Sequence, residues 1–467
     1  MAAPGEALTA VDAAWLRMDR PTNRMMICGV MLLDERIELS AFRQLVRERM
    51  LCFHRLRQRV AGARATPRWE LDPHFDLGWH VRHMALPGAA GDGLQDAMSE
   101  LVSRPLDPGK PMWQFHLVDL PHGSAIVLRI HHCYADGFAL LHVIDAMLDP
   151  DPAHPRAPPR DVSAPAPQRS ALERLLGPVT SAAGDAVRAS LALASDGAFL
   201  LAHPLRALDH ARSGADLLYQ AGLIAAMAPD AATRLKGTVG VAKRVAWAPP
   251  LALREVKAVA VALGCSVNDV LVSCVAGALR GYLLDAGDTL GGGGIRALVP
   301  VNLRPPGPLV ELGNRFGLVF LDLPVDVDDP VARVLEVHRR MDALKQSRQP
   351  WVALGILAAM GVAPEPVRER VLDVLAANAS LVLTNVHGQD EARYLAGKRV
   401  ARQMFWVPQA GGIGVGASIL SYNGQVGFGL VADALRVPDP AALAQRFAGE
   451  FERLVLAALL MPWPAES

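Results

Sequence analysis

A proline-rich run between residues 149 and 167 constrains the fold of this 467-residue chain more than any other feature. Proline fixes φ and carries no amide hydrogen, so neither a helix interior nor a central strand can continue through such a run. We therefore predict a linker between two halves. An N-terminal lobe spans 1–148 and a C-terminal lobe spans 246–467. The region between them, 149–245, contains the linker and the Ala- and Leu-rich helices that we expect at 171–235 and that would cross between the lobes.

Hydrophobic periodicity predicts the same kinds of element in both halves. Strands alternate with amphipathic helices, which by itself indicates a mixed α and β protein with two lobes. Asn423-Gly424 predicts a hairpin turn between the last two strands, and Ser266 predicts the N-cap of a further helix, with Asp269 three residues on. We expect helices at 11–18, 39–51, 93–103, 138–148, 253–263, 330–346, 352–360, 365–376 and 441–459, and strands at 25–33, 69–71, 80–84, 295–301, 318–323, 380–384, 414–421 and 425–431.

The charge balance argues against a nucleic-acid partner. The chain has 47 basic and 47 acidic side chains, and no basic stripe with interleaved aromatic residues is present in the sequence. The apolar share is nevertheless high for a neutral chain. We expect part of that apolar surplus to line a lipid-binding tunnel or to contact a membrane surface.

Cysteine usage and the chain start predict a cytoplasmic location. The five cysteines are an odd number, are scattered and lack CxxC spacing, which is typical of thiols in a reducing compartment. No basic stretch followed by an apolar run opens the sequence, so we expect no signal peptide. The longest charge-free region, 403–432, is interrupted by seven glycines, so we expect no transmembrane helix there.

An apolar strand that runs from Ser124 into two adjacent histidines carries the candidate site. Side chains alternate along a strand, so His132 shares the face of Ile130 while His131 points the other way. Desolvation on the apolar face keeps His132 neutral, as a general base requires. A purely structural histidine remains an alternative. A metal site is not expected, because adjacent strand histidines diverge and no third ligand recurs at suitable spacing.

The string from His131 to Gly137 resembles the HHxxxDG signature of the acyl-CoA-dependent acyltransferase superfamily. That superfamily includes chloramphenicol acetyltransferase, the condensation domains of peptide synthetases, and the bacterial wax ester synthase/diacylglycerol acyltransferases. This sequence departs from the elements of the wax ester synthase family at Met112, where a leucine is usual, and at His387 and Gln389, where prolines are expected. Segments that resemble the wax ester synthase family are 105–113 (PLDxxxPLW), 266–269 (vNDv), 299–304 and 312–314 (a strand and turn), 384–388 (NVPGP), and 421–429 with 437–439 (a hairpin and last helix).

The resemblance implies an α/β (α+β) fold: a two-lobed chloramphenicol-acetyltransferase-like sandwich of mixed sheets and helices with a tunnel between the lobes. It also implies transfer of a long-chain acyl group from acyl-CoA to a fatty alcohol or to diacylglycerol. Acyl-CoA is then a co-substrate and no cofactor is expected. Peripheral contact with the inner membrane or with lipid inclusions fits these substrates, while the sequence indicates no oligomeric state.

The resemblance also assigns roles around the motif. His132 Nε2 would take the proton of the acceptor hydroxyl and return it to the coenzyme A sulfur. The sequence has no GxSxG elbow, and strand alternation turns Cys133 away from the base if the strand extends that far, so direct transfer in a ternary complex is favoured over an acyl-enzyme. His131 would support the strand end by hydrogen bonds.

The resemblance also covers the remaining motif residues, whereas the oxyanion donor is sought among side chains that could face the cleft. Asp136 would be structural and paired with Arg304 or Arg57, of which Arg304 is favoured, and Gly137 would free the backbone for a tight exit. The oxyanion needs a hydrogen-bond donor. Three candidates from the second half stay open, namely Asn268, Asn385 and Ser418.

A run of small residues on the helix expected at 352–360 has two interpretations. Ala353, Gly355, Ala358, Ala359 and Gly361 could leave room for an alkyl tail, or they could allow close helix packing. Two rival functions also remain. The chain could acylate another hydroxyl or an amine, or it could be a non-catalytic lipid-binding protein of the same fold.

Overall fold

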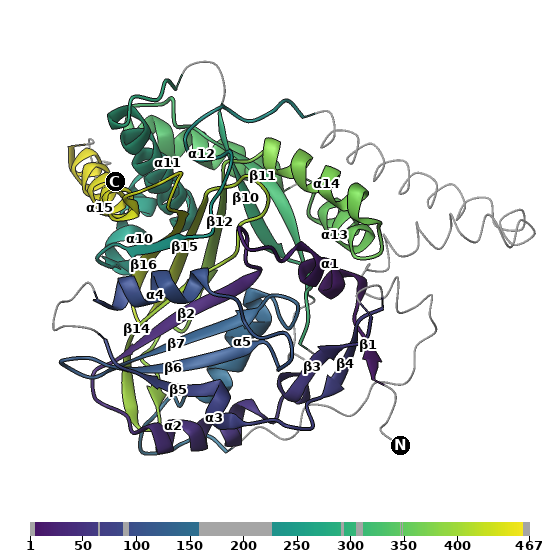
Figure 1. Ribbon diagram of the computed structural model, residues 1–467. Helices are drawn as coiled ribbons and strands as arrows, with labels where there is room; N and C mark the ends of the chain where they lie inside the picture. Colours follow the sequence, from purple (N-terminus) through teal and green to yellow (C-terminus); the bar gives the residue numbers. More distant parts are fainter. Residues whose placement is uncertain are drawn as a thin grey trace, which may run out of the picture.

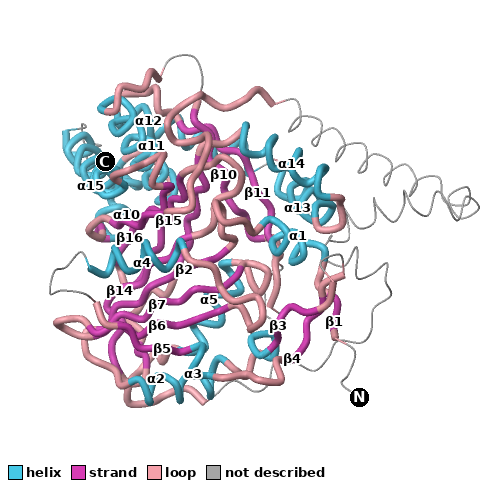
Figure 2. The backbone as a smooth tube through the Cα atoms, in the orientation of Figure 1, coloured by secondary structure: helices cyan, strands magenta, loops and turns pink. Residues whose placement is uncertain are grey.

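Two lobes, each built around one large β-sheet, make up the computed structural model of this chain (Figure 1). The structure describes residues 5–63, 66–86, 93–157, 227–290, 294–304, 312–345, 347 and 349–460. Most of the predicted crossing helices, 171–226, lie outside the described residues, and the described remainder, 227–235, is irregular. The predicted mixed α/β fold class is confirmed, as the tube view in Figure 2 makes plain.

The N-terminal lobe contains a six-stranded sheet in the order β13-β14-β2-β7-β6-β5. Neighbouring strands are antiparallel except β5 and β6, which are parallel. The central strand β7 is buried along its whole length, as its run of apolar residues requires. The strands are β2 (Met26–Leu33), β5 (Val81–Met84), β6 (Trp113–Asp119), β7 (Ser124–His131), β13 (Tyr394–Leu395) and β14 (Lys398–Trp406).

The predicted lobe boundaries are crossed by β13 and β14. Both strands come from the C-terminal half of the chain, yet β14 pairs with β2, with Phe405 opposite Gly29. The two lobes are therefore joined by shared sheet as well as by contact. The division at 148 and 246 stays a prediction.

The C-terminal lobe contains a seven-stranded sheet in the order β11-β10-β12-β15-β16-β8, with β9 also pairing with β16. β12 is parallel to both β10 and β15. The strands are β8 (Lys243–Trp247), β9 (Leu251–Ala252), β10 (Ile295–Asn302), β11 (Phe316–Leu323), β12 (Leu381–His387), β15 (Val415–Tyr422) and β16 (Gln425–Asp433).

The hairpin predicted at Asn423-Gly424 is confirmed. Tyr422 of β15 faces Gln425 of β16, and both turn residues have positive φ, 48° at Asn423 and 69° at Gly424. That backbone is the one that a two-residue turn needs to match the twist of its strands.

Helices cover the sheets of both lobes (Figure 1). α5 follows directly after β7, and α4 packs against β8 of the other lobe. The larger helices are α1 (Ala10–Met18), α2 (Leu39–Leu45), α4 (Gly93–Ser103), α5 (Gly137–Met147), α10 (Leu253–Ala262), α11 (Val267–Asp285), α12 (Pro330–Lys345), α13 (Gln349–Met360), α14 (Glu365–Ala377) and α15 (Pro440–Leu460). The smaller elements are β1 (Glu6–Ala7), β3 (Gln58–Ala61) and β4 (Arg68–Leu71), which form a separate small sheet, with α3 (Leu77–His80) and the short helices Val46–Met50 and His54–Arg57.

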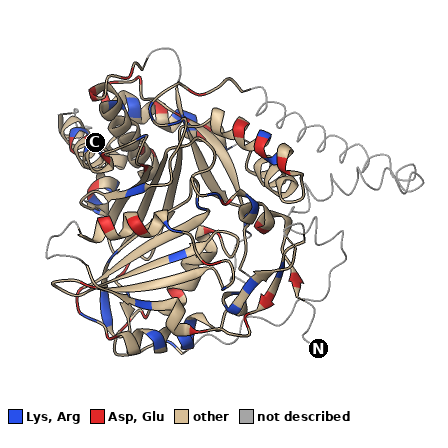
Figure 3. Ribbon diagram, viewed as in Figure 1, with Lys and Arg blue, Asp and Glu red and all other residues tan. Residues whose placement is uncertain are grey.

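Helix α11 is the centre of the C-terminal core. Ser266 caps it in a capping box with Asp269, as the sequence predicted, and Asp269 also accepts a hydrogen bond from His338 Nδ1 at 2.7 Å. By length and composition, α11 is the one described helix that passes for a membrane span, but 67% of that stretch is buried inside the protein. Basic and acidic residues are interspersed along the outer helices and strands (Figure 3).

An ion pair ties the two lobes together beside the HHxxxDG turn. Asp136 is the N-cap of α5, and its carboxylate accepts from Ala139 N at 2.9 Å. Arg304, which follows β10 of the other lobe, donates through Nη1 to both carboxylate oxygens at 2.8 and 2.6 Å. Arg315 N donates to the same carboxylate at 2.8 Å. One buried aspartate therefore holds a helix start and two points of the opposite lobe.

Close packing of α1 on α13 depends on one glycine. A Cβ at Gly361 would lie inside the backbone of Ala10, and Arg17 of α1 donates to the Gly361 carbonyl. By contrast, a Cβ at Gly355 would meet nothing within 4 Å. Close packing is thus the role of Gly361, while Gly355 leaves space.

Replacement of Gly361 should separate α1 from α13. Gly361→Ala forces the helices apart, and we expect the free energy of unfolding to fall by about 2–3 kcal/mol. Gly355→Ala is the matched control, because added side chain meets open space and alanine favours the helix by up to about 1 kcal/mol. Urea unfolding of both variants measures this difference, and equal stabilities would contradict the packing role.

Loss of the Asp136 carboxylate should strongly destabilise the fold. Asp136→Ala leaves the half-buried Arg304 guanidinium without its carboxylate and removes the N-cap of α5, and we expect a cost of roughly 3 kcal/mol in urea unfolding. The exposed pair of Arg399 with Asp34, 2.9 Å apart, is the control, since Arg399→Ala should cost at most about 1 kcal/mol. An unchanged stability in Asp136→Ala would contradict the role of this ion pair.

Candidate active site

The paired histidines lie where β7 ends. The strand stops at His131, so His132 is the first residue beyond it, although its backbone N still donates to Met25 O of the neighbouring chain segment at 2.7 Å. Strand alternation therefore does not decide where Cys133 points. Both imidazoles are buried, with His131 3% and His132 5% exposed.

His132 reaches across to the C-terminal lobe. Its Nδ1 lies 2.8 Å from Oδ1 of Asn314, just before β11. The Asn314 amide nitrogen donates to Asp12 Oδ1 and to the His132 carbonyl oxygen, both at 2.8 Å. Because both of these atoms accept, the amide orientation is set and its oxygen must face the ring. Nδ1 of His132 therefore carries the proton and Nε2 carries the lone pair.

Aromatic rings hold the imidazole plane. Trp15 of α1 stacks on His132 with ring centroids 4.0 Å apart and an interplanar angle of 13°. Phe316, at the start of β11, lies 5.7 Å from the imidazole and 5.8 Å from Trp15. Among the described residues, the ring of His132 forms its hydrogen bond through Nδ1, so the Nε2 lone pair is available to a hydroxyl.

Burial keeps His132 neutral. Desolvation lowers its pKa to about 4, against the opposing negative charge of Asp136 and the hydrogen bond to Asn314. At neutral pH the ring is therefore almost wholly unprotonated. This is the protonation state that a general base needs before it meets its substrate.

His131 has a different environment. Its Nδ1 accepts from Cys133 N at 3.2 Å, which places the ring proton on Nε2, 3.8 Å from Asp19 Oδ1. Asp19 in turn accepts from Met25 N at 2.8 Å. Burial lowers the pKa of His131 to about 4 as well. Both ring nitrogens are thus directed at the protein, which fits a structural role.

Arg304, rather than Arg57, pairs with Asp136. Arg57 lies on a short helix of the N-terminal lobe, where its Nη2 is 3.3 Å from His54 Nδ1. The expected reason for Gly137 does not hold, because its φ is not positive and a Cβ there would meet nothing within 4 Å. Gly137 instead forms part of a cavity wall.

The three oxyanion candidates are not gathered around the base by any hydrogen bond. Asn385 of β12 donates to Asn268 Oδ1 at 2.6 Å, so this pair bridges β12 and the start of α11. Ser418 of β15 is buried and receives a hydrogen bond from Thr384 Oγ1 at 3.2 Å. Asn268 keeps its own amide hydrogens as donors. The oxyanion role of all three stays a prediction.

A narrow apolar cavity of about 60 Å³ lies between the lobes, close to the HHxxxDG turn. Its walls come from β2, β7, β14 and α5 on one side and from β12 and β15 on the other. Gly137 belongs both to this wall and to the turn that holds His132. Residues that represent these elements are Val30, Leu128, Leu140, Val386, Met404 and Leu420.

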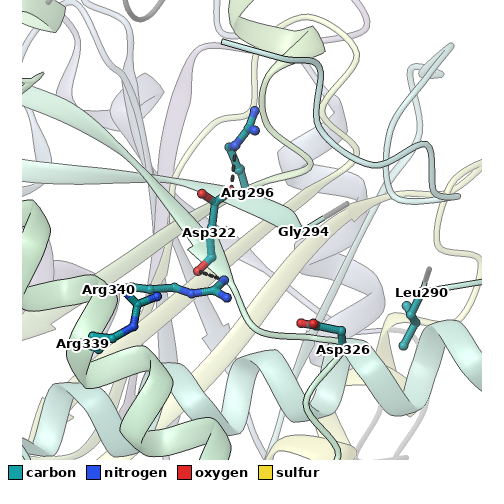
Figure 4. A pocket seen from close by; sticks show the side chains of 7 residues that line it. All are labelled: Leu290, Gly294, Arg296, Asp322, Asp326, Arg339 and Arg340. Carbon is teal, nitrogen blue, oxygen red and sulfur yellow. Dashed lines mark hydrogen bonds and ion pairs between the residues drawn. The ribbon is translucent and has the colours of Figure 1, made fainter. Parts of the chain in front are cut away.

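A larger polar pocket of about 560 Å³ lies elsewhere (Figure 4). It lies at the Ile295–Leu323 end of the β10–β11 ladder, whereas Asn302 and Phe316 mark the end near His132. Its arginines are already bonded: Arg296 Nε to Asp322 Oδ1 at 2.7 Å, and Arg340 Nη1 to the Asp322 carbonyl at 3.0 Å. This pocket is separate from the histidine site.

Sequence reasoning missed three residues that contact or support the base. Asn314 lay inside a matched segment but was given no role, while Asp12 and Trp15 were only part of a predicted helix. Asp12 and Trp15 are three residues apart on α1 and so share one face of it, which is the only local signal. Their contact with His132 depends on tertiary packing.

Two family domains match the chain. The wax ester synthase/diacylglycerol acyltransferase catalytic domain matches residues 8–271, and the C-terminal domain of the same family matches residues 312–455. The probable diacylglycerol O-acyltransferase tgs1 of Mycobacterium tuberculosis is 28% identical over 462 residues, which cover 96% of this chain and 95% of that protein. The protein tgs2 of the same organism is 29% identical over 393 residues, 81% of each chain.

Solved structures share the fold. The wax ester synthase/diacylglycerol acyltransferase from Marinobacter aquaeolei has a TM-score of 0.70 and 22% identity, and the alignment covers 97% of this chain and 100% of that one. The first condensation domain of the calcium-dependent antibiotic synthetase has a TM-score of 0.61 and 16% identity, with 98% and 97% covered. The predicted family is confirmed: since the two domain matches span most of its length in the expected order, the chain belongs to the wax ester synthase/diacylglycerol acyltransferase family.

Proposed function

We propose that this chain transfers a long-chain acyl group from acyl-CoA to the hydroxyl of a fatty alcohol or a diacylglycerol, with His132 as the general base. One observation carries the catalytic part: Nδ1 of His132 is committed to Asn314, which leaves the Nε2 lone pair free in a buried site between the lobes. Family membership and the O-acyltransferase relatives support the substrate class.

The chemistry follows from this lone pair. Nε2 takes the hydroxyl proton while the oxygen attacks the thioester carbonyl, so a C–O bond forms and a tetrahedral oxyanion results. Collapse of that intermediate breaks the C–S bond, and the proton passes from Nε2 to the coenzyme A sulfur. The transfer itself calls for no cofactor.

A covalent acyl-enzyme is not needed. Cys133 is the nucleophile nearest in sequence to the base, but it is fully buried and burial raises the pKa of its thiol well above the ordinary value. A thiol in that state is a poor nucleophile at neutral pH. This environment supports direct transfer within a ternary complex.

The apolar cavity beside Gly137 supports an alkyl substituent on one of the substrates. Its lining is apolar except for Gln403, and both lobes contribute to it. An acyl or alkyl chain in such a site gains hydrophobic burial without an unpaired polar group. A small polar acceptor would gain nothing from these walls.

We also propose a cytoplasmic protein in peripheral contact with the inner membrane or lipid inclusions, where its substrates gather. The end of α15 supports this contact, since Leu456, Leu459 and Leu460 are 62%, 59% and 86% exposed. Cys28, Cys133, Cys265 and Cys274 form no disulfide, as in a reducing compartment.

Removal of the base should abolish transfer without unfolding the protein. We expect His132→Ala to lower kcat at least about 1000-fold with palmitoyl-CoA, because no other neutral imidazole replaces Nε2. Coenzyme A release and product chromatography with hexadecanol, dipalmitoylglycerol and short polar alcohols measure both rate and acceptor. Near-normal turnover in His132→Ala would refute the mechanism, and preferred acylation of a polar alcohol would refute the substrate class.

Acidification below neutral pH should lower the free energy of unfolding, because the two buried histidines are neutral in the folded protein. His131 and His132 have folded pKa values of about 4, below the ordinary 6.5, so the unfolded chain binds their protons first as the pH falls. The stability that depends on these neutral histidines is therefore fully present above pH 6.5. It is lost between pH 6.5 and pH 4, by up to about 1.4 kcal/mol per pH unit for each histidine. Urea unfolding from pH 7.5 to 4.5 tests this, and a flat profile would contradict it.

A further inference from the structure

Helix α1 supplies a second group behind the base. Asp12 is 4% exposed, Asn314 6% and His132 5%, and the three residues come from α1, the segment before β11 and the end of β7. Asn314 Nδ2 donates to Asp12 Oδ1 and Asn314 Oδ1 accepts from His132 Nδ1, each at 2.8 Å. Three buried polar groups thus form one chain of hydrogen bonds, from a carboxylate to the base.

Resting on the function proposed above, we propose that Asp12 and Asn314 are positioning residues for acyl transfer: Asn314 fixes the tautomer of His132, and the Asp12 carboxylate, acting through the polarised amide, stabilises the imidazolium that forms as the hydroxyl proton is taken. The arrangement is that of a His–amide–carboxylate relay. No proton leaves His132 through the amide, because Nδ1 keeps its hydrogen throughout.

The amide is the physical reason for the relay. If Asn314 turned its nitrogen toward the ring, that nitrogen would lose two acceptors and Asp12 Oδ1 would face the amide oxygen. Asp12 therefore selects the amide orientation, and the amide selects the ring tautomer. Each link also polarises the next, because all three residues are buried.

Trp15 belongs to the same device. It lies on the face of α1 that carries Asp12, three residues on, and its ring is stacked on His132 at 4.0 Å. An indole face attracts a cation, so it favours the imidazolium more than the neutral ring. Packing of α1 against α13 requires Gly361, and this packing places the Asp12 carboxylate and the Trp15 indole together on the side of His132.

The charges around the base set the background for any test. Burial raises the pKa of Asp12, and hydrogen bonds from Asn314 and Thr9 with the positive charge of Arg55 oppose that effect. Among the described residues, the charged and titratable groups near His132 include His131 with Asp19 and Arg24, Cys133, Asp136 with its partner Arg304, and Asp12 with Arg55.

The test exchanges the carboxylate and the amide. In the double variant Asp12→Asn with Asn314→Asp, all charges nearby are kept, but the carboxylate now contacts Nδ1 directly. An opposite charge at contact favours the imidazolium, so the titration midpoint of His132, about 4 in the native protein, should rise by at least about one pH unit. The acid limb of kcat/KM should move with it.

Single variants separate positioning from folding. Asn314→Leu removes the acceptor of Nδ1–H and should lower kcat about 100-fold, with the KM for palmitoyl-CoA changed less than about threefold. Asp12→Asn keeps shape and hydrogen bonding without the charge and should lower kcat about tenfold. Asn378→Leu, at the end of α14, is the matched control for loss of a buried asparagine and should change the melting temperature but not kcat.

Nuclear magnetic resonance of the His132 Cε1 proton, assigned with His132→Gln, gives the titration midpoint whether or not acyl transfer occurs. If the wild type releases no coenzyme A with any lipid acceptor, the proposed function fails and this titration still tests the relay. An unchanged midpoint in the exchanged variant, or kcat within threefold of wild type in both Asn314→Leu and Asp12→Asn, would overturn the relay.

Discussion

The hydrogen bond between His132 and Asn314 is the interaction on which the rest of the site depends, because it exists only when the two lobes are closed on each other. A buried hydrogen bond adds only about 1 kcal/mol to stability, but a buried imidazole or amide left unpaired costs more than that. The Asp136 ion pair with Arg304 holds the same turn from its other side. Together these contacts make the geometry of the base a property of the lobe interface rather than of either lobe.

Most of the fold could be predicted where the signal is local. β7 is indicated by a largely apolar run that only Arg129 interrupts, and the Asn423-Gly424 turn follows from backbone geometry that few residues adopt. β14 was missed because Arg399 and Arg402 break its apolar pattern, and because its partner β2 lies hundreds of residues earlier. Periodicity describes one segment at a time, so it cannot show that a strand crosses from one half of the chain into the sheet of the other.

The residues of the candidate site also divide into those with a local sequence signal and those without one. His132, Asp136 and Arg304 were predicted because each lies in a segment that resembles a family motif, and the structure places Asp136 and Arg304 in contact. The roles of Asn314 and Asp12 could be recognised only in the folded structure, because no rule of sequence spacing relates residue 12 to residue 314. Gly137 shows the opposite error. The glycine was expected to free the backbone for a tight exit from the turn, but its φ is not positive, and the residue instead lines a cavity.

The proposed base, His132, has a pKa of about 4 and is therefore weak, and this weakness limits the proposed mechanism. Such an imidazole cannot remove the proton of an alcohol in advance, so proton transfer has to accompany formation of the C–O bond, when the oxygen becomes acidic. Burial produces the weakness, yet burial also excludes the water that would hydrolyse the thioester. A carboxylate held one amide away offsets part of the desolvation without sitting against the ring, where it would protonate the base at rest. The Asp12 to Asn314 arrangement therefore suits a base that must stay neutral until its substrate arrives.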